Sequence, residues 1–252
     1  MQDWTDANQL QVMPVEDVAL PVVIMGTSPF MGAGQFGERS FFYRQTFYDN
    51  PENITSLLRY VASSGVVAVQ LMLYPPIIKA FIAARKECEI ELLAVPTIGP
   101  HEVEADLQTA KDLKAPVAIL HGALVDHLDL HQLSELCDKI RAEHLIPGLA
   151  THAPLKSVPL LEKSHVDYGF WMAPLNPAGY MLMDRDKTIS IYESCSKPIL
   201  AKKTLAAGRI SPSQALPFIT TVKTVKWVTI GITSEQEADE TLAEARRIWE
   251  RN

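Results

Sequence analysis

Four side chains that can move protons or form covalent bonds stand where short apolar segments of the sequence end. His121 and His152 each end such a segment and precede a Gly or Pro turn, and Lys202 and Lys203 end a third. An imidazole titrates near working pH, so the two histidines could donate and accept protons in a reaction. A lysine among apolar neighbours has a lowered pKa and could form a Schiff base with a carbonyl compound.

Each of these residues also has a purely structural interpretation. A histidine at a strand end can be a hydrogen-bonded rim residue, and a lysine there can extend its charge to solvent along an apolar stem. Because side chains alternate along a strand, we expect one of Lys202 and Lys203 to face the mouth of the fold and the other to face the surrounding helices.

The segments that carry these residues belong to a regular alternation of short apolar runs and helical patterns. Short apolar runs separated by helices are typical of a parallel sheet buried on both faces. We expect strands at residues 21–29, 66–73, 90–97, 116–121, 146–152, 167–173, 198–202 and 227–231. We expect helices at residues 53–64, 77–87, 102–113, 130–143, 155–163, 184–194, 213–221 and 234–249. Eight such units predict an α/β protein, a single-domain (β/α)8 TIM barrel over residues 1–252.

Two segments lie outside this repeat. Residues 1–19 are weakly patterned, and we expect a leading arm, with a small hairpin that plugs the bottom of the barrel. Residues 30–50 are rich in glycine and aromatic residues and predict a long loop over the barrel mouth. Such loops are commonly lids or binding loops, and the alternative is an aromatic flap that packs on the rim.

The active site of a TIM barrel lies at the carboxyl ends of its strands. Gln70, Tyr74, His121, His152 and the two lysines follow strand ends and are the candidate catalytic residues. Carboxylates do not cluster at these ends, and no third ligand is evident beside the two histidines. We therefore expect no metal ion.

The loops after the last two strands resemble an anion site. Gly208, Arg209, Gly231, Thr233 and Ser234 offer backbone donors, two hydroxyl groups and a guanidinium group. In barrels, these loops often hold a phosphate against a helix amino terminus. The alternative is that Thr233 and Ser234 only cap a helix and that Gly208 only makes a turn.

Composition limits the partners of this chain. Its net charge of −7 argues against nucleic acid, which requires clustered Lys and Arg. The start of the sequence has no signal-peptide pattern, and no apolar run is long enough to span a membrane. The three cysteines have no metal-binding spacing. We expect a cytoplasmic protein whose partner is a small carbonyl or phosphorylated compound; the sequence leaves open whether it forms a homo-oligomer.

Four stretches of the chain resemble the aldo-keto reductases. They are residues 119–122, 148–154, 197–209 and 230–237, and the resemblance runs in order from about residue 22 to residue 245. The branch that they resemble often carries a ferredoxin-like tail with an iron–sulfur cluster, which does not appear in this sequence. The resemblance implies a TIM barrel and hydride transfer between NADP(H) and a small carbonyl compound, through an Asp, Tyr, Lys and His tetrad.

This sequence departs from the tetrad that the resemblance implies. His121 matches the histidine, and Tyr74 lies one position short of the tyrosine. Gln70 stands at the aspartate position and Thr97 at the lysine position. Without that lysine and aspartate, the phenol lacks the charges that would make it a proton donor near neutral pH.

The cofactor side of the resemblance is better kept. Arg209, Gly231, Thr233 and Ser234 lie where the family wraps the dinucleotide, although Thr241 replaces the asparagine usual near the adenine. The full set of candidate cofactor-binding residues is Thr151, Asn176, Gly208, Arg209, Gly231, Thr233 and Ser234.

Three functions remain open. The first is an NADP(H)-dependent oxidoreductase in which His121 orients a carbonyl group and Tyr74 donates the proton. The second is a cofactor-independent lyase, aldolase or isomerase that uses His121 and His152, with Lys202 or Lys203 as a Schiff-base residue. The third is a ligand-binding barrel without catalysis.

Overall fold

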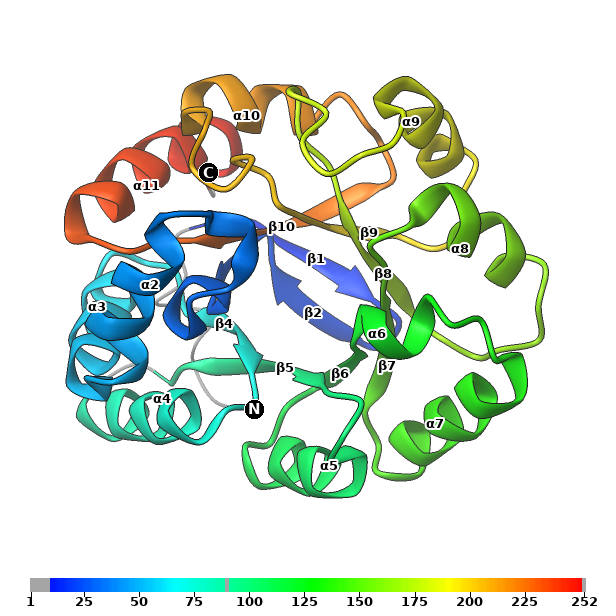
Figure 1. The fold of residues 1–252 in the computed structure, drawn as a ribbon, viewed down its shortest axis with the longest axis horizontal. Coiled ribbons are helices and arrows are strands. Elements are labelled where there is room, and N and C mark those ends of the chain that lie inside the picture. Colours follow the sequence, from blue (N-terminus) through cyan, green and yellow to red (C-terminus); the bar gives the residue numbers. More distant parts are fainter. Residues whose placement is uncertain (1–9, 89–90, 251–252) are drawn as a thin grey trace.

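The computed structural model describes residues 10–88 and 91–250 of the chain. Eight parallel strands form a closed barrel in the order β10-β3-β4-β5-β6-β7-β8-β9. Helices surround this barrel on the outside (Figure 1). The predicted (β/α)8 TIM barrel is therefore confirmed.

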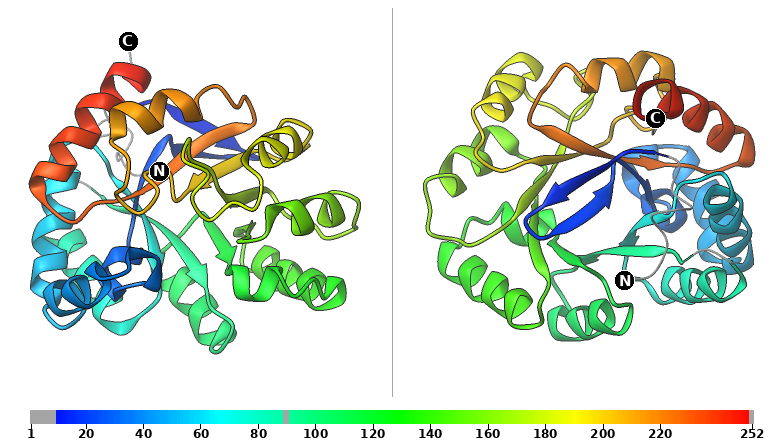
Figure 2. Two further views of the ribbon diagram at one scale, coloured as in Figure 1. Left: turned by 45° about the horizontal axis from the view of Figure 1, so that its top comes forward. Right: turned by 180° about the vertical axis from the view of Figure 1, so that it is seen from behind.

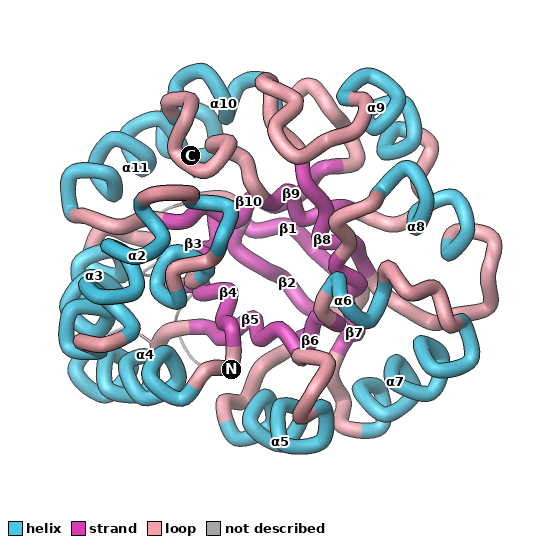
Figure 3. The backbone as a smooth tube through the Cα atoms, in the orientation of Figure 1, coloured by secondary structure: helices cyan, strands magenta, loops and turns pink. Residues whose placement is uncertain are grey.

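The strands and helices lie close to the positions expected from the sequence. The barrel strands are β3 (Val23–Gly26), β4 (Ala68–Met72), β5 (Leu93–Ile98), β6 (Val117–Leu120), β7 (Ile146–Ala150), β8 (Phe170–Pro174), β9 (Ile199–Lys202) and β10 (Val225–Gly231). The longer helices are α3 (Pro51–Ser63), α4 (Pro75–Glu87), α5 (Val103–Asp112), α7 (Leu130–Ala142), α8 (Pro154–Leu161), α9 (Arg185–Glu193), α10 (Pro212–Ile219) and α11 (Glu235–Trp249). Figure 3 shows the strands as the central ring of the molecule.

An antiparallel hairpin crosses the amino-terminal end of the barrel. It consists of β1 (Val12–Val15) and β2 (Val18–Pro21), and Figure 2 shows it from behind, across the barrel opening. Leu20 is fully buried with the side chains of the barrel interior, and its carbonyl oxygen accepts a hydrogen bond from Trp227 Nε1 at 3.2 Å. The first nine residues of the expected leading arm lie outside the described residues.

The barrel interior is filled with side chains at this lower end. Phe170 and Trp227 place their rings 6.0 Å apart, and both are buried. Gly148 of β7 faces the Phe170 ring, where a Cβ atom would lie only 2.5 Å from Phe170 Cζ. The amino-terminal end of the barrel interior is therefore closed by packed side chains.

The segment expected as a long loop at residues 30–50 is instead mostly helical. It forms η1 (Ser28–Met31), η2 (Gly34–Phe36), α2 (Arg39–Tyr43) and η3 (Arg44–Tyr48). Phe30, Tyr43 and Phe47 are buried against the barrel, whereas Phe41 is 75% exposed. Burial of one aromatic face stabilises these short turns, and their irregular spacing explains why no helical period is visible in the sequence.

Within the described part of the chain, none of the helices combines the length and apolarity needed to cross a bilayer.

Candidate functional site

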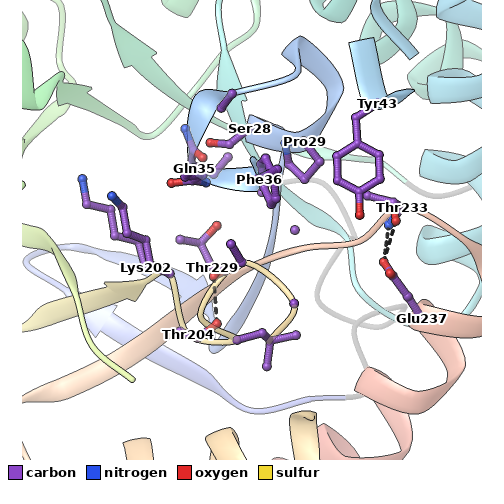
Figure 4. Close-up of a pocket in the computed structure, with 18 of the residues that line it drawn as sticks. Ser28, Pro29, Gln35, Phe36, Tyr43, Lys202, Thr204, Thr229, Thr233 and Glu237 are labelled. Carbon is purple, nitrogen blue, oxygen red and sulfur yellow. Dashed lines mark hydrogen bonds between the residues drawn. The ribbon is translucent and has the colours of Figure 1, made fainter. Parts of the chain in front are cut away.

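A pocket of about 450 Å³ opens at the carboxyl ends of the barrel strands. This volume lies within the range of small-molecule sites. Its walls come from the strand ends, from the 28–48 segment and from the loop that follows β9; Figure 4 shows several of the lining residues. Four cationic side chains, Arg39, Lys202, Lys203 and Arg209, line the pocket together with two carboxylates, Glu237 and Glu240.

The pocket brings together most of the residues that the sequence proposes for a site. Nine of them line it: Gln70, His121, His152, Lys202, Lys203, Gly208, Arg209, Gly231 and Thr233. Four others do not line it: Tyr74, Thr151, Asn176 and Ser234. The candidate catalytic and cofactor-binding groups thus share one cavity.

The two histidines lie on neighbouring strand ends, with ring centroids 5.6 Å apart. His121 begins the short helix α6 (Gly122–Val125), and its Nδ1 accepts a hydrogen bond from the Ala123 amide at 3.1 Å. The neutral ring therefore carries its proton on Nε2. Burial, followed by the charges of His152 and Lys202, lowers the pKa of His121 to about 4. His121 is thus a neutral hydrogen-bond donor at pH 7.

His152 has the opposite arrangement. Its Nδ1 lies 3.4 Å from Asp126 Oδ2. A carboxylate beside Nδ1 favours the proton on that nitrogen, which leaves Nε2 as an acceptor. The Asp126 hydrogen bond raises the pKa of His152, but burial and the charges of Lys202 and Lys203 outweigh it, and the pKa is lowered overall. One histidine of the pair therefore offers a hydrogen-bond donor, His121 Nε2–H, and the other offers an acceptor, His152 Nε2.

Asp126 is a site residue that the sequence analysis missed. Its carboxylate accepts hydrogen bonds from Thr151 Oγ1 at 2.6 Å, Ser157 Oγ at 2.7 Å and the His152 amide at 2.8 Å. Although burial acts to raise it, bonds from His152, Thr151 and Ser157 hold the pKa of Asp126 well below its usual range. Thr151, expected near a cofactor, is fully buried in this network.

Lys202 ends β9, and only 9% of its surface is exposed. Burial, followed by the charge of Lys203, lowers the pKa of Lys202 to about 7. Burial also lowers the pKa of Lys203 to about 8. The expectation that the two lysines face opposite ways is wrong, because both line the pocket. Lys203 adopts φ +58°, which breaks the strand alternation at this point.

The loop that follows β9 has an unusual backbone. Ala206 and Ala207 have φ values of +50° and +56°, and Gly208 has +76°. Non-glycine residues in this region are uncommon, and strained backbone of this kind is enriched at functional sites. Arg39 donates a hydrogen bond to the Ala207 oxygen, and Arg209 Nη1 donates to the Ala206 oxygen at 3.0 Å. These bonds hold two guanidinium groups beside the loop.

Side chains of the protein itself occupy hydrogen-bonding groups at the amino terminus of α11. Glu237 Oε2 accepts hydrogen bonds from the Thr233 amide at 2.7 Å and from Thr233 Oγ1 at 2.8 Å, as Figure 4 shows. Ser234 Oγ accepts from the Glu237 amide at 3.1 Å and caps the helix. The cationic groups available to an anion are therefore those of Arg39, Arg209 and the lysines.

Gln70 and Thr97, at the aspartate and lysine positions of the implied tetrad, form a neutral hydrogen-bonded pair. Gln70 Nε2 donates a 2.7 Å hydrogen bond to Thr97 Oγ1, and both side chains are buried. Tyr74 is 38% exposed and packs against Tyr48, with ring centroids 6.1 Å apart. Tyr74 directly precedes the Pro75–Pro76 start of α4 in an extended conformation, which fixes its position outside the pocket.

Asn176 is also a structural residue here. It is fully buried, its Nδ2 donates to the Tyr180 and Lys203 carbonyl oxygens, and its Oδ1 accepts from the Tyr180 amide at 2.8 Å. The Arg209 guanidinium in turn stacks on Tyr180, with Cζ 4.2 Å from the centroid of the Tyr180 ring. Asn176 thus supports the loop that holds Arg209.

In the parts of the chain that are described, no three His, Cys, Asp or Glu side chains lie close enough to hold a metal ion.

Solved structures of aldo-keto reductases share this fold. The barrel matches a Pseudomonas aeruginosa protein assigned as an aldo-keto reductase, with a TM-score of 0.68, 17% identity, and 95% of this chain and 96% of the other covered. A thermostable aldo-keto reductase solved with the inhibitor epalrestat matches with a TM-score of 0.65, 13% identity and 94% of each chain covered. The resemblance to this family is confirmed for the fold, as strong structural similarity at low sequence identity.

Proteins of other activities share the same barrel. Phosphoribosylanthranilate isomerase of Thermotoga maritima matches with a TM-score of 0.54, 15% identity, 77% of this chain and 94% of that chain. No protein-family model matches the sequence, and no curated protein is similar to it at the sequence level. A barrel of this kind hosts many chemistries, so the residues of the site, and not the fold, determine the reaction.

Proposed function

We propose that this protein is an oxidoreductase that uses NADP(H) to reduce a small carbonyl compound. One observation carries the proposal: a single pocket joins the proton-handling groups His121 and Lys202 to the cationic loop around Gly208 and Arg209. The aldo-keto-reductase-like fold supports the same activity.

The pocket suits an anionic dinucleotide in its charge. Arg39, Arg209 and Lys203 would hold phosphate groups, since guanidinium and ammonium groups bind phosphate through charge-assisted hydrogen bonds. Glu237 occupies the Thr233 donors, so the loop after β9 is the better phosphate site. When bound, NADPH would supply a hydride to the carbonyl carbon.

The residues of the chain would handle the carbonyl oxygen. The Nε2–H group of His121 would donate a hydrogen bond to that oxygen and stabilise the negative charge that develops on it. Lys202 would then donate a proton, because an ammonium group with a pKa of about 7 gives up its proton readily at neutral pH. Lys202 replaces Tyr74 in this role.

Binding of NADPH tests the proposal. We expect saturable, micromolar binding by calorimetry, and at least tenfold weaker binding in an Arg209→Ala variant, since a hydrogen bond to a charged group contributes about 1.5–3 kcal/mol. Arg185→Ala is the matched control, because Arg185 is not among the residues that line the pocket. Absence of binding at millimolar NADPH would reject the proposal.

A further inference from the structure

Lys202 lies next to an unusual hydroxyl group. Ala201 of β9 pairs with Val228 of β10, so the next residues along these strands, Lys202 and Thr229, are neighbours. Figure 4 shows both at one end of the pocket. Thr229 is 7% exposed, and among the described residues its Oγ1 has no hydrogen-bond partner. A buried hydroxyl without a partner lowers the free energy of unfolding by about 1–3 kcal/mol, and such groups are therefore uncommon in native structures.

Gly26 on the neighbouring strand β3 packs closely against this hydroxyl. A Cβ atom on Gly26 would lie 2.8 Å from Thr229 Oγ1. Even alanine at this position would therefore press on the hydroxyl. The Thr229 hydroxyl is thus enclosed by protein in the pocket wall, and Lys202 lines the pocket next to it.

Proton-transfer groups lie within electrostatic reach of the amine. The charge of Lys202 lowers the pKa of both His121 and His152, and Asp126 acts on Lys202 in the opposite sense. Lys203 also lines this part of the pocket, but its Nζ lies 3.0 Å from Met181 Sδ. The surroundings of Lys202 therefore include His121, which donates a hydrogen bond, and His152, which can accept a proton.

We propose that Lys202 is a nucleophile that forms an imine with an aldehyde or ketone bound in the pocket beside His121 and His152. This inference does not rest on the proposed function, because it requires no nicotinamide cofactor. The chemistry needs the unprotonated amine. A pKa of about 7 leaves roughly half of the Lys202 amine unprotonated at pH 7, about a thousandfold more than for an ordinary lysine.

The reaction balances with the groups of this site. The nitrogen lone pair attacks the carbonyl carbon, a C–N bond forms, and the C=O π electrons move to oxygen. His152 accepts a proton from nitrogen and passes it to the oxygen, which the Nε2–H group of His121 stabilises. The second proton of the nitrogen then moves to the same oxygen. The C–O bond breaks, water leaves and the C=N bond forms. One imine and one water form, and nothing is oxidised or reduced.

Reductive trapping tests this inference on the intact protein. The protein is incubated with glyceraldehyde at pH 7 without nicotinamide cofactor, treated with cyanoborohydride, digested and mapped by mass spectrometry. We expect modification at Lys202, with a mass increase equal to the aldehyde less one oxygen atom, at least tenfold faster than at Lys187. Lys187 is the internal control because its side chain is 77% exposed.

The Lys202→Met variant, which keeps a similar length without the amine, should lose this adduct while its circular dichroism spectrum is unchanged. Modification of Lys202 no faster than Lys187, or selective modification of Lys203 instead, would overturn the inference. Because peptide mapping of the wild-type protein is decisive alone, the test stands even if a variant fails to fold.

Discussion

Replacing His121 by alanine is expected to lower carbonyl reduction by about a hundredfold to a thousandfold, the usual effect of removing one hydrogen-bond donor to a developing oxyanion. His121 Nδ1 is engaged by the Ala123 amide, and its low pKa keeps the ring neutral, so Nε2–H is the donor presented to the pocket. Alanine removes that donor without filling the pocket. The loss should fall on kcat more than on KM, because the hydrogen bond strengthens as charge develops on oxygen.

The matched control for this variant is His127→Ala. His127 is exposed and lies in the same connection between β6 and α7, but it does not line the pocket. The rate of nicotinamide oxidation should be unchanged in His127→Ala. Equal kcat/KM values for the wild-type protein and His121→Ala would contradict the role assigned to His121.

Replacing Asp126 by alanine is expected to destabilise the protein by about 3 kcal/mol at pH 7. Three donors lose their acceptor: the hydroxyls of Thr151 and Ser157 and the His152 amide. Each bond to a charged group contributes about 1.5–3 kcal/mol, but the 22% exposure of the Asp126 side chain lets water replace part of the loss. Urea unfolding measures the difference in the free energy of unfolding.

The same variant has a defined pH dependence. The folded-state pKa of Asp126 lies below its ordinary value of 3.8, so the folded protein binds fewer protons than the unfolded chain. The contribution of Asp126 is therefore fully present above that value and is lost as the pH falls below it. The stability difference between wild type and Asp126→Ala should shrink below about pH 4.

Asp186→Ala provides the control for Asp126→Ala. The Asp186 side chain is 80% exposed and pairs with Arg185 at the surface, so its loss should change stability by no more than about 0.5 kcal/mol. A loss in Asp126→Ala as small as that in Asp186→Ala would show that the network around Asp126 contributes little.

The barrel follows from the sequence because its physical signals are local and repeated. Each strand is a short apolar run, and each helix has its own periodicity, so the alternation predicts the topology without knowledge of any contact. Helix and strand ends differ by a few residues; α3, for example, begins at Pro51 rather than near residue 53. The aromatic segment at residues 28–48 was not predictable as helix, since its turns depend on burial of Phe30 and Phe47 against the barrel.

The site was predictable only in part. His121, His152 and Lys202 follow strand ends, and parallel strands bring such ends together. Asp126 was missed because the sequence around it gives no sign of its contacts with Thr151 and Ser157, which are 25 and 31 residues away. Thr229 was missed because the alternation within a strand shows which face it occupies, but not that its hydroxyl lacks a partner.

The direct test of the central claim is whether hydride passes from the cofactor to a carbonyl carbon at this pocket. NADPH with both C4 hydrogens replaced by deuterium is incubated with the protein and a panel of small aldehydes and ketones that includes glyceraldehyde, and the alcohol products are examined by mass spectrometry. The proposed function predicts deuterium on the former carbonyl carbon of at least one product, and its loss in the His121→Ala variant. NADPH bound to saturation with no deuterium in any product would contradict it, and would leave the amine of Lys202 as the chemistry of this barrel.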